Sequence, residues 1–226
     1  MITSSRTPAQ GFTLMELLTV IAIVGVLAAV AIPVIGHARQ SASEARGMSN
    51  IHQLVIAHLE YAADNRGMFP PKYLANVSPV WQAPLVPYLA VKNAKADQMY
   101  SLRQNPESIF NVPDSKPAAE RKTSATSIAR NYNLREPNWN YRLNAVQTSA
   151  NTLLLGECVE ANLDEMGGLK ADGITPVASS VTTPGFRRAD GNAALMGFVD
   201  GHVGAISRDA LRGDRTAAAG NLWRWW

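Results

Sequence analysis

Glu16 is the residue whose position in the sequence most clearly indicates a chemical role. It stands directly before residues 17–38, LLTVIAIVGVLAAVAIPVIGHA, which carry no charge when His37 is neutral. A carboxylate beside such a run is costly if it is carried toward the centre of a membrane, so a residue of this kind is more often functional than accidental. Thr19 and Val20 occupy the positions three and four residues on, where a helical ion-pair partner would stand. We therefore expect Glu16 to meet a cation from elsewhere, such as an α-amine released by a cut just upstream.

A second group of carboxylates follows a short apolar run, Thr152–Gly156, which predicts a buried strand. Oxygen ligands of this type suit calcium, but their spacing is not that of an EF-hand loop. We therefore expect a solvated acidic loop over 157–172 and no cofactor, with calcium as the weaker alternative. The carboxylates are Glu157, Glu160, Asp164, Glu165 and Asp172.

Asp200 and His202 form the third candidate, because residues two apart on a strand share a face. A hydrolase would also need a nucleophile or a metal, and the sequence contains no G-x-S-x-G, H-E-x-x-H or P-loop pattern. The apolar runs 193–199 and 202–206 flank Asp200-Gly201, which predicts a tight hairpin with Gly201 at positive φ. We interpret the pair as a turn aspartate and a surface histidine, and no catalytic site is predicted.

Basic and aromatic residues are interleaved between residues 116 and 142. Together they could hold single-stranded nucleic acid or an anionic glycan by charge and stacking. A solvated, partly packed surface is the simpler interpretation, and nucleic acid is not an expected partner. The residues are Lys116, Arg121, Lys122, Arg130, Arg135 and Arg142, with Tyr132, Trp139 and Tyr141.

Composition excludes several classes of protein. The chain has 226 residues with 21 basic and 18 acidic side chains, too small an excess to argue for nucleic-acid binding. Cys158 is the only cysteine, so an intrachain disulfide and a cysteine-rich zinc site are impossible. The four histidines are scattered, and His52 and His58 do not share a helix face, so we expect core or surface histidines instead of ligands. No enzymatic activity is predicted.

The element that must position Glu16 is a membrane-spanning helix. Twenty-two residues at about 1.5 Å each reach roughly 33 Å, which matches a bilayer core of about 30 Å. A buried core helix is one alternative. A secretory signal peptide cut near Ala31 is another, although the run is longer than the usual ~7–15 residues and begins after an acid.

Residues 11–18, GFTLMELL, resemble the processing site of type IV pilins and type II secretion pseudopilins. The resemblance implies that a prepilin peptidase cuts between Gly11 and Phe12 and methylates the new N-terminus. It also implies that Glu16 neutralises the Phe12 amine of a neighbouring subunit during filament assembly. Gly25 and Pro33 match the family's pattern too, and Pro33 should kink or open the helix because it cannot donate a backbone hydrogen bond.

The helix is predicted to continue to about Asn65 and to pack on a head domain. Met48, Ile51, Val55, Leu59 and Ala62 form an apolar stripe at spacings of three and four, and Gly67 is the expected C-cap. For residues 70–150 we expect loops and short elements. The run FVDGHV at 198–203 resembles a C-terminal pattern of a pilin-like group, although Asp190 stands where a histidine is usual.

These observations predict an α+β fold in which one long N-terminal helix packs on a small antiparallel head. We expect a leader at 1–11, a membrane and assembly helix at 12–36, an amphipathic continuation at 37–66 and a periplasmic head at 67–226. The resemblance implies four kinds of partner: prepilin peptidase, other pilin or pseudopilin subunits, an inner-membrane assembly platform and membrane lipid. A membrane-anchored binding module that displays residues 116–142 remains an open alternative, as does a secreted enzyme.

Overall fold

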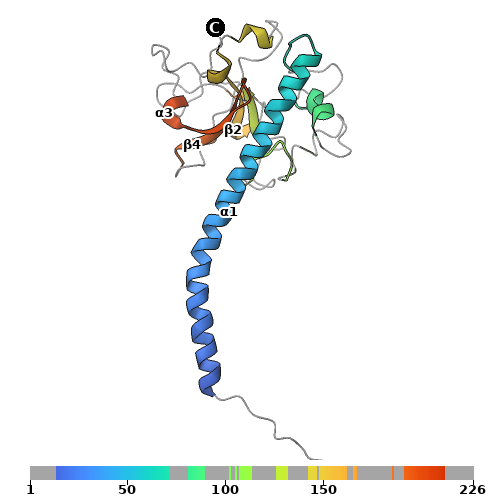
Figure 1. Cartoon of the computed structure of the whole chain (residues 1–226). Coiled ribbons are helices and arrows are strands. Elements are labelled where there is room, and N and C mark those ends of the chain that lie inside the picture. Colours follow the sequence, from blue (N-terminus) through green and yellow to red (C-terminus); the bar gives the residue numbers. More distant parts are fainter. Residues whose placement is uncertain are drawn as a thin grey trace, which may run out of the picture. The chain divides into compact units, whose positions relative to one another are not determined.

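The structure is a computed structural model that describes residues 14–71, 81–89, 102, 105, 107–113, 126–131, 142–146, 148–161, 165–166, 185 and 191–211. The chain divides into two compact units, Met1–Ala42 and Ser43–Trp226. Helix α1 (Leu14–Asp64) contributes to both units and is the longest element of the fold (Figure 1). The part of α1 from Ser43 onward belongs to the same unit as the sheet.

A five-stranded sheet forms the centre of the second unit, in the order β3-β1-β2-β4-β5. Four strands pair antiparallel, as predicted, and the two-residue edge strand β3 pairs in parallel with β1. The sheet is therefore mixed at one edge. The strands are β1 (Thr126–Asn131), β2 (Leu153–Ala161), β3 (Glu165–Met166), β4 (Ala193–Phe198) and β5 (Val203–Ser207).

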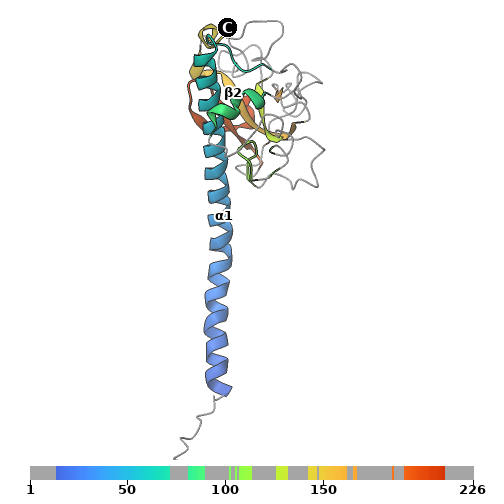
Figure 2. The ribbon, with the colours of Figure 1, turned by 90° about the vertical axis from the view of Figure 1, so that its right-hand side faces the viewer.

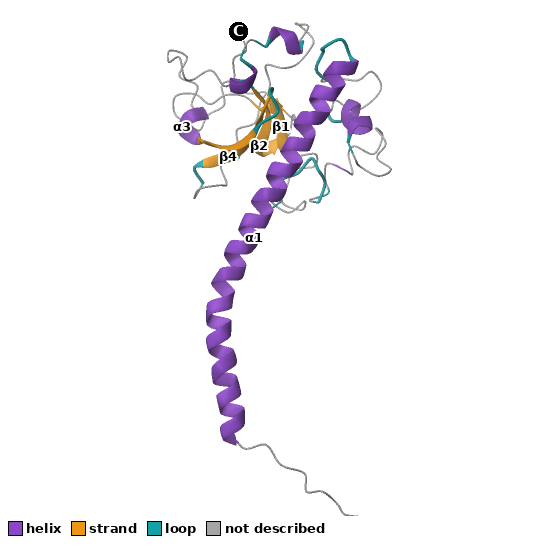
Figure 3. Ribbon diagram, viewed as in Figure 1, coloured by secondary structure: helices purple, strands orange, loops and turns teal. Residues whose placement is uncertain are grey.

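Short helices connect or follow the strands in the described parts of the chain (Figure 3). Three of them are 3-10 helices, η1 (Ala83–Tyr88), η4 (Leu143–Ala145) and η5 (Ser149–Asn151). The fourth, α3 (Arg208–Leu211), follows β5 directly. Strand β1, with six residues, is one short element in the stretch for which the sequence predicted loops and short elements. Strand β2 extends well beyond the predicted Thr152–Gly156.

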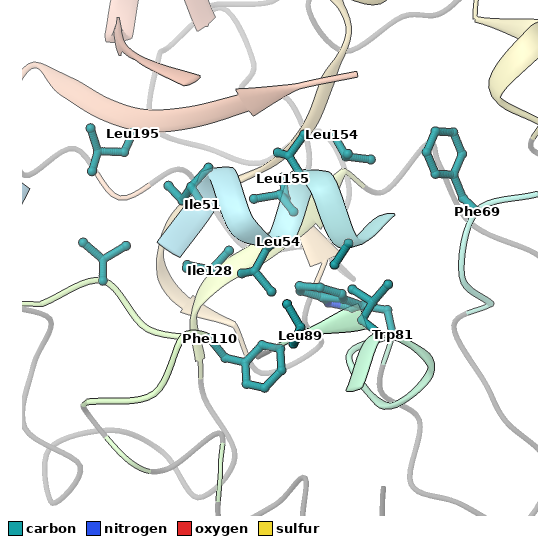
Figure 4. Packing of buried hydrophobic residues seen from close by; sticks show 14 of the residues in the cluster. Ile51, Leu54, Phe69, Trp81, Leu89, Phe110, Ile128, Leu154, Leu155 and Leu195 are labelled. Carbon is teal, nitrogen blue, oxygen red and sulfur yellow. The ribbon is translucent and has the colours of Figure 1, made fainter. Parts of the chain in front are cut away.

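The core of the second unit lies between α1 and one face of the sheet (Figures 1 and 2). Ile51, Leu54 and Val55 of α1 are fully buried there. They pack in one cluster with residues of the sheet, including Ile128, Leu155 and Leu195, and with Trp81 and Phe110 from the loops (Figure 4). The predicted stripe is confirmed for Ile51, Val55 and Ala62, while Met48 and Leu59 are half-buried beside the core.

Gly197 allows α1 to approach β4 closely. A Cβ atom at this position would lie 2.6 Å from Cγ2 of Val55 and 2.8 Å from Cγ2 of Ile51. Contacts this short require the backbone or the helix to move, so only glycine fits the observed packing. The residue types on both elements thus set the distance between helix and sheet.

The C-terminal end of α1 is close to the prediction but uses a different residue for the left-handed position. The helix ends at Asp64, and the N–H of Gly67 donates to the carbonyl of Ala62 at 2.7 Å. A hydrogen bond that spans five residues in this way is characteristic of a Schellman motif, in which the residue before the donor adopts the left-handed conformation. That residue is Arg66, with φ 57°, and Gly67 follows it with φ 79°.

Candidate functional site: the N-terminal helix

The first part of α1 presents its apolar side chains outward on every side. All fourteen large hydrophobic residues from Leu14 to Ile35 are between 50% and 81% exposed. The most apolar stretch of this helix is 0% buried, and the helix is long and apolar enough to cross a membrane. A helix that is apolar all round needs an apolar environment, and a soluble core does not supply one here. The alternative of a buried core helix therefore has no support from the described residues.

Glu16 lies in the first turn of α1 and is exposed. The hydroxyl of Thr19 donates to the backbone carbonyl of Glu16 at 2.9 Å. An acidic side chain in the first turn is stabilised by the positive end of the helix dipole. Gly11 and Phe12, the predicted processing residues, lie outside the described residues.

Gly25 and Pro33 are both inside α1, which is helical from Leu14 to Asp64 without a break. Apart from its two chain neighbours and the nearby backbone of α1, nothing lies within 4 Å of a Cβ built on Gly25. Because Pro33 has no N–H, the carbonyl of Ala29 loses its helical donor, and the predicted weakness at this point stays a prediction. The structure thus shows the two residues in a continuous helix.

The predicted hairpin turn connects β4 and β5. These strands pair from Ala193↔Ser207 to Gly197↔Val203, and Gly201 has φ 103°. The N–H of Gly201 donates to the carbonyl of Phe198 at 3.1 Å, and the N–H of Phe198 donates to that of His202 at 2.9 Å. The loop therefore has three residues, 199–201, one more than Asp200-Gly201 alone, and is of the kind that ends in a left-handed glycine.

Asp200 and His202 contact each other at the surface of this turn. Oδ1 of Asp200 accepts from the backbone N–H of His202 at 3.2 Å and lies 2.6 Å from its Nδ1. The His202 ring stacks on Phe198 with centroids 4.0 Å apart and an interplanar angle of 9°. These contacts account for both residues as parts of the turn, in agreement with the interpretation from sequence.

The acidic stretch after β2 does not begin as a solvated loop. Glu157 is a fully buried residue of β2, and its Oε2 accepts from the backbone N–H of Leu195 at 3.3 Å. Its carbonyl accepts from Gly185 at 2.8 Å. The expectation of a solvated loop is therefore wrong for Glu157, because long-range strand pairing draws this residue into the sheet. Glu160 and Glu165 are residues of β2 and β3, and Asp164 and Asp172 lie outside the described residues.

No group of three or more potential metal-ligating side chains gathers in the part of the chain that the structure describes. The calcium alternative thus gains no support there.

Arg130 corrects the prediction for the basic stretch 116–142. It is a fully buried residue of β1, and its guanidinium donates to the carbonyl of Pro70. It therefore cannot belong to an exposed basic surface. Arg142 is exposed and forms an isolated antiparallel β-bridge with Met68. The other named basic and aromatic residues of the stretch lie outside the described residues.

Sequence reasoning missed a buried cluster around His58. The histidine is fully buried, and its ring lies 5.0 Å from the ring of Trp81, between centroids. His52 is exposed, so the two histidines divide into one core and one surface residue as expected. The spacing of His58 from Val55 and Ala62 was the available signal, since it extends the buried face of α1.

Comparison with known proteins adds one match. Residues 6–32 match the family model of the prokaryotic N-terminal methylation motif. No curated protein and no solved structure matches the chain. The match covers the predicted processing residues, Glu16 and the first part of α1, and it does not reach the hairpin at 198–203. The chain therefore carries a prokaryotic N-terminal methylation motif on an exposed apolar helix, an arrangement consistent with a type IV pilin-like or pseudopilin-like protein.

Proposed function

We propose that this protein is a structural subunit, a pseudopilin or minor pilin, of a type II secretion or type IV pilus-like filament. The observation that carries the proposal is the methylation motif at residues 6–32, joined to a helix whose apolar side chains are exposed all round. Such a helix is stable in a bilayer before assembly and among equivalent helices afterwards. The subunit can thus move from membrane to filament without exposing this surface to water.

In this proposal, prepilin peptidase cuts between Gly11 and Phe12 at the cytoplasmic face of the inner membrane. The new amine of Phe12 is methylated, and the head lies in the periplasm. Glu16 of one subunit then compensates the Phe12 amine of a neighbour. Because an unpaired buried charge is strongly penalised, this pairing enforces the register of packing more than it adds affinity.

Mass spectrometry of the mature N-terminus tests the proposal most directly. The protein is expressed with its cognate peptidase and isolated from membranes, and we expect a methylated phenylalanine at position 12. A start at residue 1 would indicate an uncut membrane anchor, and a start near Ile32 would indicate a secreted protein. Either result would contradict the proposal.

Two glycine variants provide a matched comparison. Gly11→Val should block cleavage, because it changes the residue at the proposed scissile bond. Gly25→Ala should be processed normally, because a Cβ there meets no atom within 4 Å apart from its chain neighbours and the nearby backbone of α1. Equal processing of both variants would remove Gly11 from the proposed site.

A further inference from the structure

His58 lies where three segments of the head meet. It belongs to the last turns of α1, its ring packs against Trp81 at the start of residues 81–89, and the guanidinium of Arg130 on β1 is near enough to act on its charge. All three side chains are fully buried or nearly so. The imidazole therefore touches both the helix and the loop segment that packs on it.

The contacts of His58 fit only the neutral imidazole. Nδ1 lies 2.7 Å from the carbonyl of Leu54, and because a carbonyl only accepts, Nδ1 carries the proton. Nε2 is buried and has no hydrogen-bond partner among the described residues. A second proton on Nε2 would therefore place an uncompensated charge in the core, beside the positive Arg130.

Among the described residues, Arg130 is the charged group that acts on His58, and it does not offer compensation. In the segment 81–89, the titratable side chain is Tyr88, whose hydroxyl donates to Asp64 at 3.0 Å. Burial is the main reason that the pKa of His58 falls from 6.5 to about 3, and Arg130 lowers it further. The hydrogen bond to Leu54 acts in the opposite direction but is outweighed.

The segment 81–89 packs on this site without belonging to the strand ladder. The backbone hydrogen bonds that the structure shows within it are local, Leu85 to Gln82 at 3.0 Å and Leu89 to Val86 at 3.3 Å. It is held to the head by buried side chains such as Trp81 and Leu85, whereas β2 and β4 are joined by a strand ladder. Segments held mainly by side-chain packing open at lower free energy than paired strands.

We propose that His58 is an acid-sensitive latch, and that protonation of its imidazole releases residues 81–89 from α1 while the sheet stays paired. Opening lets the imidazole reach water, where it takes up one proton from solvent, and closing expels that proton. The N–H bond formed at Nε2 is the one covalent change, and it is reversed on closing. The inference concerns the head alone and does not depend on filament assembly.

The pH dependence of opening follows from the different pKa values of His58 in the closed and the open state. The closed state binds the second proton only near pH 3, and the open state binds it at the ordinary histidine pKa of about 6.5. The free energy needed to open residues 81–89 is therefore highest above pH 6.5 and decreases as the pH falls toward 3. Uptake of one proton raises the open population by up to about tenfold per pH unit below 6.5, so we expect a roughly 100-fold increase between pH 7.5 and 4.5.

Hydrogen exchange with mass spectrometry on the full chain in detergent micelles tests this latch. Protection is measured from pH 7.5 to 4.5 and corrected for the intrinsic exchange rate. We expect peptides covering 81–89 to lose protection progressively below pH 6.5, while peptides covering 153–158 and 193–198 keep theirs. Simultaneous loss in the segment and in the sheet would overturn the proposal, as would unchanged protection of 81–89.

Variants of His58 separate its titration from general acid effects. His58→Phe keeps a ring against Trp81, and His58→Asn keeps a donor near the Leu54 carbonyl, so at least one of the two should preserve the fold. Neither side chain titrates in this range, and both should remove the pH dependence of residues 81–89. His52→Asn, on the exposed face of the same helix, should behave as the wild type. A pH dependence that persists in both His58 variants would refute the latch.

Discussion

Gly197 has no side chain, and this allows α1 to pack close to the sheet. A methyl group at this position would overlap with side chains of Ile51 and Val55, which are themselves fully buried. The sequence contains sixteen glycines, and periodicity alone does not indicate which of them faces a helix. The role of Gly197 follows from a contact between residues about 145 positions apart.

Gly197→Ala should destabilise the head by about 1–3 kcal/mol, because the added methyl group overpacks a filled interface. Denaturant unfolding of the full chain in micelles measures the effect. Gly204→Ala is the matched control on the neighbouring strand, since its nearest contact is Cδ1 of Ile206 at 4.0 Å. The control should change stability by less than about 0.5 kcal/mol. Equal effects of the two substitutions would show that the contact with α1 is not responsible.

Arg66 adopts a backbone conformation that is unfavourable for a residue with a side chain. It holds a left-handed conformation, φ 57°, at the end of α1, where glycine is the usual residue. Arg66→Gly should stabilise the head by about 1 kcal/mol, because a side chain in this region is strained. Arg66→Ala removes the charge and keeps the strain, so it should leave the unfolding midpoint nearly unchanged. A stabilisation shared by both variants would point to charge instead of conformation.

At the scale of elements, Asn111 joins three segments in the head. Its Oδ1 accepts from the backbone N–H of Ser127 on β1 at 3.0 Å, and its Nδ2 donates to the carbonyl of Asn105 at 2.7 Å. Its own carbonyl accepts from Nδ2 of Asn50 on α1 at 2.8 Å. A fully buried amide thus connects Asn105 and the segment 107–113 with the helix and the sheet.

Asn111→Ala should cost about 2–3 kcal/mol of unfolding free energy, because it leaves the buried N–H of Ser127 without its acceptor. Asn50→Ala removes one bond from a part-buried side chain and should cost about 1 kcal/mol. Thermal unfolding followed by circular dichroism compares the two. A larger loss for Asn50→Ala would contradict the central position of Asn111.

The elements that could be predicted from sequence are those specified by neighbouring residues. Helix α1 and its end near Asn65 follow from a long periodic pattern and a local stop signal, and the β4–β5 turn follows from Asp200-Gly201 between two apolar runs. Strand β1, TSIARN, has little apolar alternation, and it is a strand because β2 and β3 pair with it. The burial of Arg130 depends on Pro70, sixty residues away, and no local pattern reports such a contact.

For the whole molecule, the proposed role of Glu16 leads to a test of assembly. Glu16→Leu should keep membrane insertion and cleavage but impair filament formation, because the neighbour's amine would lose its compensating charge. Glu60→Leu, an exposed carboxylate of the same helix within the head unit, is the control and should assemble. Filaments sheared from cells and quantified by immunoblot measure the outcome. Normal incorporation of Glu16→Leu would contradict the charge pairing.

Helix α1 also determines where the chain can be shortened. The buried residues of α1 begin at Ser43, and the continuous run of exposed large apolar residues ends at Ile35, with Ile56 the one such residue of α1 further along. A water-soluble fragment should therefore start between these positions, and one that starts at Gly67 would lose Ile51, Leu54 and Val55 and aggregate. Tolerance to substitution should change at the same boundary. Upstream, most apolar side chains should be interchangeable, and downstream the buried face should accept few replacements.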